Sequence, residues 1–224
     1  MAHHLGDFSL FEGLGEQTLD MLDRRSRLRQ MPKSSIVFFQ GDPPEGAYLV
    51  CQGTVSILLA HPDGRELAIN EMVLGECFGE LSVITGQARS TGAVTKTRCE
   101  LIMIPNEAFL QAIADEPLLA QRLLEITARR LYSSSEYQGA LAFLNAPARL
   151  ARVLLLMDDK ESERGFMTVS QSELALWTGS TRQTVAAALG RWRRAGWLLT
   201  GRGKVMLLNR KALRAVEQQS GFES

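Results

Sequence analysis

The spacing of hydrophobic residues changes twice along this chain of 224 residues. Leu19 and Leu22 share one face of a helical pattern that starts near Glu16 and closes with the basic stretch Arg24–Arg29, so we expect a helical segment near the N-terminus. From residue 35 to residue 104, short apolar runs are instead separated by turn residues at intervals of about 8–12 residues, which is typical of an antiparallel barrel or sandwich. Helical spacing returns after Pro105.

Six apolar runs are the predicted strands, and they occupy residues 36–40, 47–50, 55–60, 67–72, 93–95 and 101–104. Gly41-Asp42-Pro43 and Pro62-Asp63-Gly64 separate them as turn signals. Cys51, Cys77 and Cys99 lie singly in this region without a Cys-x-x-Cys pair. We therefore expect three small core residues and no metal site.

A long helix is predicted to begin near Asp115 and Pro117. Residues on one face of it recur at alternating steps of four and three, namely Ala120, Leu124, Thr127, Leu131, Ser134, Gln138 and Leu141. A symmetric homodimer would cover this seam, and the alternative is a helix packed on its own barrel. The run Ser133-Ser134-Ser135 is unusual within this helix, because consecutive hydroxyl residues contribute little helix propensity or packing, and one interpretation is a solvated patch of serines.

A second structural unit is predicted after Asn145-Ala146-Pro147, which ends the long helix. Ser170-Gln171-Ser172-Glu173 has the pattern of a capping box that opens a short helix. Ala175, Gly179 and Val185 then follow at the spacing of a helix-turn-helix, in which a small residue allows close approach, a glycine makes the turn and an apolar residue anchors the second helix. The alternative is a generic helical hairpin.

The second helix is predicted over residues 181–195, and its N-terminal residues are the candidates for contacting base edges in the major groove. Arg182 can pair with guanine and Gln183 with adenine, whereas Thr184 suits a phosphate. A hairpin with the basic tip Gly201-Arg202-Gly203-Lys204 follows and resembles the wing of a winged helix. The complete set of candidate DNA-binding residues is Ser180, Thr181, Arg182, Gln183, Thr184, Ala187, Arg202 and Lys204.

The net charge differs in sign between the two parts of the chain, which indicates that they have different roles. Residues 1–144 carry 12 Lys and Arg against 18 Asp and Glu, a net charge of −6, and residues 145–224 carry 13 against 7, a net charge of +6. The basic part suits a polyanion. No apolar run is long enough for a membrane span, no signal-peptide pattern begins the chain, and no catalytic constellation is evident, so we expect a cytoplasmic protein that is not an enzyme.

The stretch from Phe78 to Thr91 contains the richest chemistry in the sequence. Glycines at 75, 79 and 86 allow tight turns and close approach to a ligand. Arg89 offers a planar fork of donors for a phosphodiester, and Glu80 can accept a sugar hydroxyl. The alternative is a glycine-rich turn whose Glu and Arg form a solvated ion pair.

Phe78-Gly79-Glu80-Leu81 followed by Arg89-Ser90-Thr91 resembles the phosphate-binding cassette of cyclic-nucleotide-binding domains. With the long helix and the helix-turn-helix, the resemblance extends to the Crp–Fnr family of transcription regulators over nearly the whole chain. It implies that Glu80 binds the ribose 2′-hydroxyl and Arg89 the cyclic phosphate. Arg129-Arg130-Leu131 aligns Ser134 and Ser135 with two hydroxyl residues that bind the adenine, one from each subunit.

The resemblance implies an α+β fold with an N-terminal antiparallel, jelly-roll-like β-roll over residues 1–115, a dimerisation helix over 116–144 and a winged helix-turn-helix over 145–224. The candidate ligand-binding residues are Gly79, Glu80, Leu81, Arg89, Ser90, Thr91, Ser134 and Ser135. The implied partners are double-stranded DNA and a second copy of the chain, with RNA polymerase as a further candidate.

The expected activity is ligand-gated, sequence-specific binding of DNA, with cAMP as the preferred effector and cGMP as the second choice. No metal or other cofactor is expected. Three alternatives stay open: the same fold with another effector or with constitutive activity, a regulatory module that does not bind DNA, and an enzyme. The family's best-known members have Glu at the position of Gln183 and Arg at the position of Ala187. We therefore expect this protein to recognise a different operator sequence.

Overall fold

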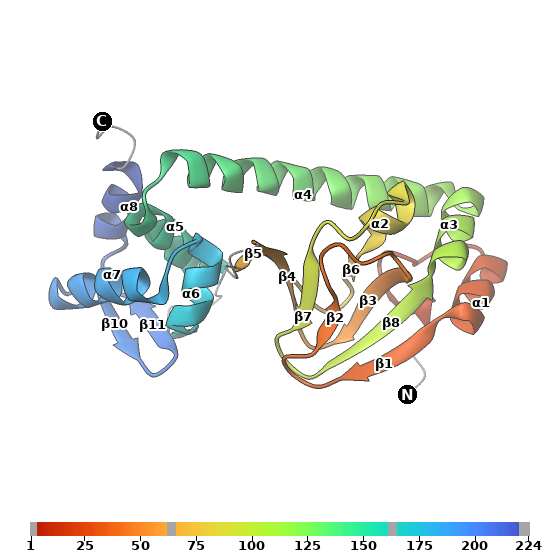
Figure 1. The fold of residues 1–224 in the computed structure, drawn as a ribbon, viewed down its shortest axis with the longest axis horizontal. Coiled ribbons are helices and arrows are strands. Elements are labelled where there is room, and N and C mark those ends of the chain that lie inside the picture. Colours follow the sequence, from red (N-terminus) through yellow and green to blue (C-terminus); the bar gives the residue numbers. More distant parts are fainter. Residues whose placement is uncertain (1–3, 62–65, 161–164, 220–224) are drawn as a thin grey trace. The chain divides into compact units, whose positions relative to one another are not determined.

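The computed structural model describes residues 4–61, 66–160 and 165–219 of the chain (Figure 1). The chain divides into two compact units between Leu131 and Tyr132. This boundary lies inside a single helix, α4 (Pro117–Phe143), and each unit has its own hydrophobic core. Among the described helices, none combines the length and the apolar character needed to span a bilayer.

The first unit is built on two antiparallel sheets of four strands, with the orders β1-β8-β3-β6 and β2-β7-β4-β5. This arrangement confirms the predicted β-roll, and each of the six predicted strands overlaps an observed one. The strands are β1 (Arg27–Met31), β2 (Ile36–Phe38), β3 (Gly46–Gln52), β4 (Val55–Ala60), β5 (Glu66–Met72), β6 (Cys77–Phe78), β7 (Gly92–Thr95) and β8 (Cys99–Pro105).

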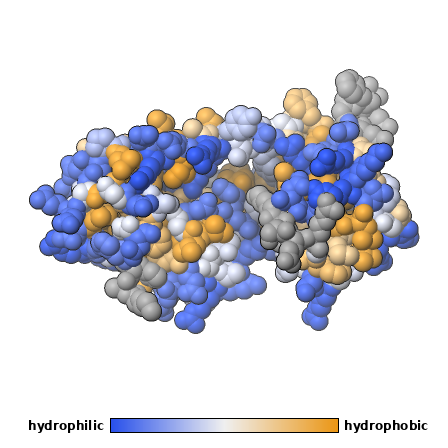
Figure 2. All heavy atoms as spheres, turned by 180° about the vertical axis from the view of Figure 1, so that it is seen from behind, coloured by the Kyte–Doolittle hydropathy of each residue, from blue (hydrophilic) through white to orange (hydrophobic). Residues whose placement is uncertain are grey.

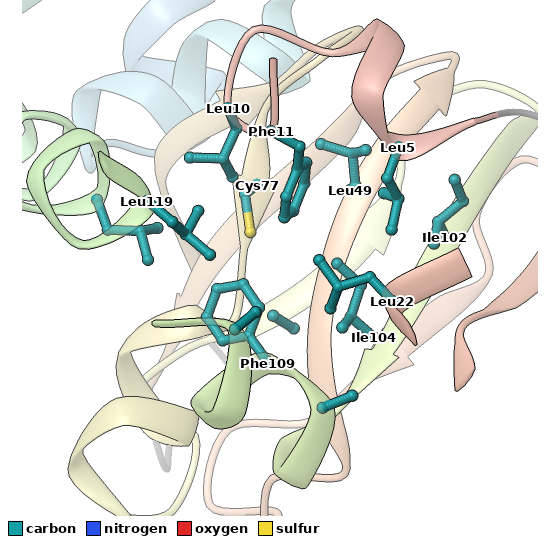
Figure 3. Close-up of a cluster of buried hydrophobic side chains, with 14 of the residues drawn as sticks. Leu5, Leu10, Phe11, Leu22, Leu49, Cys77, Ile102, Ile104, Phe109 and Leu119 are labelled. Atoms are coloured by element: carbon teal, nitrogen blue, oxygen red, sulfur yellow. The ribbon is translucent and has the colours of Figure 1, made fainter. Parts of the chain in front are cut away.

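Strand β3 is buried on both faces, because successive side chains of a strand point in opposite directions. Tyr48 and Val50 face the core between the two sheets. Ala47, Leu49 and Cys51 face a second cluster, which is closed by helical residues on the other side of the sheet (Figure 3). The helices around that cluster are η1 (Leu5–Asp7), α1 (Glu16–Arg25), α2 (Glu80–Thr85), α3 (Asn106–Asp115) and the start of α4.

The three cysteines occupy the predicted core positions. Cys51, Cys77 and Cys99 are at most 6% exposed, and all three are free thiols. Burial raises the pKa of the Cys51 thiol to about 11. Among the described residues, no group of three or more His, Cys, Asp or Glu side chains is arranged to hold a metal ion.

One expectation about the first unit is wrong, and one of its helices was missed. The N-terminal helix ends at Arg25, and the stretch that was expected to close it forms strand β1, in which Leu28 pairs with Ile102 of β8. Tertiary pairing overrides local helical spacing here. In addition, α2 (Glu80–Thr85), a six-residue helix inside the glycine-rich stretch, was not predicted. The predicted turn at 62–64 lies outside the described residues.

The second unit contains the C-terminal part of α4 and a three-stranded sheet with the order β10-β11-β9. Val185 is buried as predicted, together with Leu189 and Trp192 on the same helix, and all three belong to the core of this unit. The remaining elements are α5 (Ala146–Lys160), β9 (Met167–Thr168), α6 (Gln171–Thr178), α7 (Arg182–Arg194), β10 (Leu198–Gly201), β11 (Lys204–Leu207) and α8 (Arg210–Gln219). This is the predicted winged helix-turn-helix.

Helix α4 continues without a break through Ser133-Ser134-Ser135, in agreement with the predicted seam that runs from Ala120 to Leu141. On the predicted seam, Leu124 is 70% exposed and Leu131 is 67% exposed. On the face shown in Figure 2, hydrophilic residues predominate and hydrophobic ones form separate groups.

Candidate effector and DNA-binding sites

The glycine-rich stretch forms a strand, a left-handed turn and a short helix. Strand β6 ends at Phe78, Gly79 adopts a left-handed conformation with φ of 74°, and α2 begins at Glu80. Only glycine adopts this conformation without strain. A Cβ atom on Gly79 would also lie 2.7 Å from a terminal nitrogen of Arg89 and 3.3 Å from the Phe38 ring. Gly79 therefore leaves the space in which the Arg89 side chain lies.

Arg89 is buried, with 4% of its surface exposed. Its guanidinium donates to the backbone oxygens of Gly79 at 2.6 Å and Gly46 at 2.7 Å and to the Ser82 hydroxyl at 2.7 Å. The guanidinium carbon also lies 4.2 Å from the centre of the Phe38 ring, within the range of a cation–π contact. All the partners of this cation are thus neutral.

The Nε–H group of Arg89 is buried and has no hydrogen-bond partner in the described structure. No carboxylate among the described residues lies within ion-pair distance of Arg89, and burial lowers the pKa of its guanidinium. A buried cation with an unsatisfied donor is costly unless an anion completes its environment. The donor set fits a phosphate oxygen.

Glu80 is also buried, with 2% exposure, and its carboxylate accepts a hydrogen bond from Arg130 of α4 at 2.7 Å. Arg130 donates in addition to the backbone oxygen of Cys77 at 2.7 Å. Burial raises the pKa of Glu80, and the charge of Arg130 opposes this rise. The ion pair therefore holds a carboxylate in an apolar setting, where it can accept a hydroxyl of a ligand.

The other candidate ligand-binding residues differ in exposure. Leu81 and Ser90 are exposed, and Thr91 is half-buried beside Arg89 in the sequence. Ser134 and Ser135 are exposed on the part of α4 that belongs to the second unit. The Ser134 hydroxyl accepts a hydrogen bond from Gln138 at 3.4 Å. The structure thus brings Gly79, Glu80 and Arg89 together in the first unit, and a joint site with the two serines stays a prediction.

The helix-turn-helix has the predicted local geometry. Ser170 accepts a hydrogen bond from the Glu173 backbone, and the Glu173 carboxylate accepts one from the Ser170 backbone, which completes the capping box. Gly179 ends α6 in a left-handed conformation with φ of 57°. Ala175 and Val185 are buried where the two helices pack together. These features orient α7 on the core of the second unit.

The N-terminal end of α7 presents the candidate base-reading residues to solvent. Thr181 caps the helix by accepting a hydrogen bond from the backbone N–H of Thr184 at 3.1 Å. Arg182, Gln183 and Ala187 are exposed, as contact with base edges requires. Ser180 donates to the Thr178 backbone oxygen at 3.3 Å, so this hydroxyl has a role in closing α6.

A cavity of about 280 Å³ lies between the wing and the two helices of the helix-turn-helix. Arg182, Arg202 and Lys204 contribute to its lining, together with Ser170 and Ser172 at the start of α6. The two wing residues are exposed. The grouping of cations with hydroxyl groups on one side of the unit suits the phosphates of a nucleic-acid backbone.

Comparison with known proteins matches both units. The family described as "Cyclic nucleotide-binding domain" matches residues 28–116, and the "Crp-like helix-turn-helix domain" matches residues 148–216. The chain is 30% identical over 206 residues to the CRP-like cAMP-activated global transcriptional regulator of Mycobacterium tuberculosis, with 89% of this chain and 92% of the relative covered. It is 31% identical over 196 residues to the cyclic AMP receptor protein of Thermus thermophilus, with coverages of 88% and 90%.

Solved structures agree with this result. The c-di-GMP-responsive global regulator CLP of Xanthomonas campestris superposes with a TM-score of 0.78 at 28% identity, covering 86% of this chain and 99% of that one. The catabolite activator protein of Thermus thermophilus gives a TM-score of 0.53 at 30% identity, covering 93% and 97%. Fold and sites thus define a DNA-binding regulator that carries a cyclic-nucleotide-binding domain. The chain belongs to the Crp–Fnr family of transcription regulators.

Sequence reasoning missed the neighbours that position the two cassette residues. In the sequence, Arg130 served only to align Ser134 and Ser135 with the family, whereas in the structure it pairs with Glu80. Arg89 is held by the Ser82 hydroxyl and the Gly46 carbonyl. A basic residue on the helix that follows a binding domain is a usable signal for Arg130. The Gly46 carbonyl carries no signal, because any residue supplies a backbone oxygen.

Proposed function

We propose that the protein is a homodimeric regulator whose specific DNA binding is controlled by a cyclic nucleotide, with cAMP preferred and cGMP second. Two relatives are named for cAMP, which supports the order of preference. The expected location is the cytoplasm, where double-stranded DNA and RNA polymerase are available as partners. The relatives considered above are named as regulators, a receptor and an activator, so catalysis is not part of the proposal.

The observation that carries the proposal is the unsatisfied Nε–H of buried Arg89. A cyclic phosphate would accept from this group and compensate the buried charge. Arg89 lies next to Gly79 in space and is followed in the sequence by Ser90 and Thr91. The backbone N–H and hydroxyl groups of these neighbours can donate to the remaining phosphate oxygens. Glu80 would accept the ribose 2′-hydroxyl while Arg130 balances its charge.

Recognition of the base is assigned to Ser134 and Ser135, which lie on exposed turns of α4. In the proposed dimer, one serine serves its own subunit's ligand and the next serves the partner's. Leu124, at 70% exposure on the first part of the same helix, is a candidate for the dimer contact. Analytical sedimentation of the Leu124→Glu variant measures whether the dimer is lost. Leu110→Glu, at a 42% exposed leucine on α3, is the control. If both variants remain dimers, the seam is not the interface.

On the DNA side, Arg182 and Gln183 would read bases, Ala187 would contact a thymine methyl group, and Thr184 would bind a phosphate. Ser180 and Thr181 lie next to these residues at the start of α7, and Arg202 and Lys204 in the wing add phosphate contacts. The net charge of +6 over residues 145–224 supports this assignment.

A different effector is the second candidate, and one neighbour gives a specific reason to test it. CLP of Xanthomonas campestris is named as responsive to c-di-GMP and has 28% identity with this chain. Both cAMP and c-di-GMP carry phosphodiesters that Arg89 could bind, so the residues around Arg89 alone do not discriminate between these two effectors. Constitutive DNA binding without an effector is the remaining alternative.

Calorimetric titration of the purified protein with cAMP, cGMP and c-di-GMP tests the proposal. We expect saturable binding of cAMP, and its affinity should fall by more than about tenfold in Arg89→Gln because a charge-assisted hydrogen bond is lost. Arg98→Gln is the matched control, since Arg98 is exposed between β7 and β8. If only c-di-GMP binds, c-di-GMP takes the place of cAMP as the proposed effector. If none of the three nucleotides binds, the proposal that a nucleotide controls DNA binding is wrong.

A further inference from the structure

The guanidinium of Arg89 has five N–H groups, and the protein itself binds three of them. Nη1 donates to the Gly79 backbone oxygen and to the Ser82 hydroxyl, so both of its hydrogens have acceptors. Nη2 donates to the Gly46 backbone oxygen. In the described structure, the groups left for a ligand are the buried Nε–H and the second hydrogen of Nη2. The contacts at Nη1 therefore decide which edge of the guanidinium is open to a phosphate.

Ser82 holds Arg89 and the turn before α2 at the same time. It is buried in the first turn of α2. Its hydroxyl accepts from Nη1 of Arg89 at 2.7 Å and donates at 3.0 Å to the Gly79 backbone oxygen, which also accepts from Nη1. A serine hydroxyl can donate and accept at once, so the three groups form a closed triangle of hydrogen bonds. Nη1 cannot turn toward a ligand without leaving both of its acceptors.

The ring of Phe38, in strand β2, covers one face of the same guanidinium. Its centre lies 4.2 Å from the guanidinium carbon. The rings of Tyr48 and Phe78 hold it in place, with centroids 5.7 Å and 6.0 Å away. The face of an aromatic ring carries partial negative charge and attracts a cation, most strongly where water is excluded. Because the hydrogen-bond partners of Arg89 are neutral, the ring supplies part of the negative charge that this buried cation lacks.

We infer that Phe38 and Ser82 are positioning residues for phosphate recognition, which hold the Arg89 guanidinium in its buried position with the Nε–H edge open to the ligand. This inference rests on the proposed function for the identity of the ligand. A side chain that is held in its binding conformation loses less freedom when the ligand arrives. Affinity therefore rises with the fraction of the protein in which Arg89 is already in place. Neither side chain needs to touch the ligand to act in this way.

Removal of the Ser82 hydroxyl has a matched control in the same helix. Thr85 also donates its hydroxyl to a backbone oxygen, that of Leu81 at 2.7 Å, and has no hydrogen bond to Arg89 in the described structure. We expect Ser82→Ala to weaken cAMP binding by at least about fivefold, because buried Nη1 loses an acceptor, and Thr85→Ala to leave the affinity unchanged. Unchanged affinity in Ser82→Ala would overturn the inference. Tighter binding would also overturn it, because the hydroxyl would then compete with the phosphate.

The Phe38 ring can be tested without a change of shape. Phe38→Leu removes the ring but also leaves a cavity, so a phenylalanine with three ring fluorines is the second variant. Fluorine withdraws negative charge from the ring face while the ring stays in place. Phe109 of α3, equally enclosed in the other core cluster of this unit, is the control position for both replacements. We expect the fluorinated ring to lower cAMP affinity by at least about fivefold at position 38 and not at position 109. Parent affinity with the fluorinated ring at position 38 would contradict the role of Phe38.

Phosphorothioate analogues separate a positioning role from a general loss of stability. In the two diastereomers of the cAMP phosphorothioate, sulfur, a weak acceptor, replaces one or the other exocyclic oxygen of the phosphate. A guanidinium held with one edge toward the phosphate should bind one diastereomer more tightly. We expect the ratio of the two dissociation constants to fall by at least about threefold in Ser82→Ala and to keep its parent value in Thr85→Ala. If Ser82→Ala weakens both diastereomers by the same factor, the role of Ser82 is structural and the inference is wrong.

A last measurement needs no effector, so it separates failure of this inference from failure of the proposed function. NMR of the ligand-free full chain with isotope-labelled arginine follows exchange of the Arg89 Nε–H with water, and the signal is assigned by its absence in Arg89→Gln. We expect exchange to be at least about tenfold faster in Ser82→Ala and with the fluorinated ring at position 38, and unchanged in Thr85→Ala. Exchange at the parent rate in the first two variants would overturn the inference. Faster exchange in a chain that binds no nucleotide would support the positioning and refute the proposed function.

Discussion

The guanidinium of Arg130 lies 2.7 Å from the buried carboxylate of Glu80 and so joins the long helix to the start of α2. The same guanidinium donates to the Cys77 backbone oxygen, one residue before Phe78. Glu80, which is proposed to bind the ribose, is therefore held by Arg130. Arg130 is the next-to-last residue of the first unit, which ends at Leu131. A ligand hydroxyl on Glu80 would act on the ion pair and through it on α4.

Removal of Arg130 should destabilise the first unit. In Arg130→Gln the Glu80 carboxylate, which is 2% exposed, stays buried without its counter-charge. We expect the free energy of unfolding to fall by about 2–4 kcal/mol, slightly less than for a fully buried pair because Arg130 is 24% exposed. Denaturant unfolding measures this loss. The neighbouring Arg129→Gln, an exposed residue, is the control and should change little; equal effects of the two substitutions would contradict the account.

The Glu80 carboxylate should make stability depend on pH. Burial raises its pKa in the folded state above that in the unfolded state, so the folded state binds more protons between the two values. The contribution of Glu80 to stability is complete below its ordinary pKa and is lost as pH rises through the raised value. The difference in unfolding free energy between the parent and Glu80→Gln should therefore decrease from about pH 4 upward and then level off. A difference that grows with pH would show that Arg130 lowers the pKa more than burial raises it.

Two glycines of the cassette offer a matched pair of substitutions. Gly79 and Gly86 flank α2 and both have positive φ, of 74° and 68°. A Cβ on Gly79 meets Arg89, whereas nothing lies within 4 Å of one on Gly86. Each Ala substitution should cost about 1 kcal/mol of stability through the backbone. Only Gly79→Ala should in addition displace Arg89 and weaken effector binding, which calorimetry would measure; equal affinities in the two variants would argue against the assigned site.

Base and phosphate contacts should respond differently to substitution. Arg182→Ala should cost about 1–3 kcal/mol for the selected operator and little for random DNA, because it removes a base contact. Lys204→Ala should weaken binding to both DNAs and lower the salt dependence of binding by about one unit of slope, because it removes a phosphate contact. Fluorescence anisotropy over a series of salt concentrations measures both effects. If Arg182→Ala weakens random and selected DNA equally, Arg182 contacts only the backbone.

Much of the fold follows from local patterns. Every predicted strand overlaps an observed one, since alternation and turn residues report which segments can lie in a sheet. The capping box at Ser170 and the turn at Gly179 were predicted because each requires a particular residue type. Helix α2 was missed because six residues are too few for a helical period, and β1 was missed because only its pairing with β8 makes it a strand.

The site was only partly predictable from the sequence. Glu80 and Arg89 were identified because their side-chain chemistry and the surrounding glycines point to a phosphate and a sugar. Their partners depend on how distant segments meet. Arg130 reaches Glu80 from 50 residues away, and the Gly46 carbonyl reaches Arg89 from 43 residues away. The hydrogen bond from the Tyr137 hydroxyl to the Trp177 backbone oxygen likewise joins segments 40 residues apart, which no local pattern reports.

The most direct test of the account is the affinity of the full chain for its operator with and without cAMP. An operator selected from random duplexes in the presence of cAMP can be labelled and titrated by fluorescence anisotropy at fixed salt, with Arg89→Gln as the variant that lacks the phosphate contact. We predict that cAMP increases operator affinity by about tenfold or more in the parent and has no effect in Arg89→Gln. Equal affinities with and without cAMP in the parent protein would contradict it.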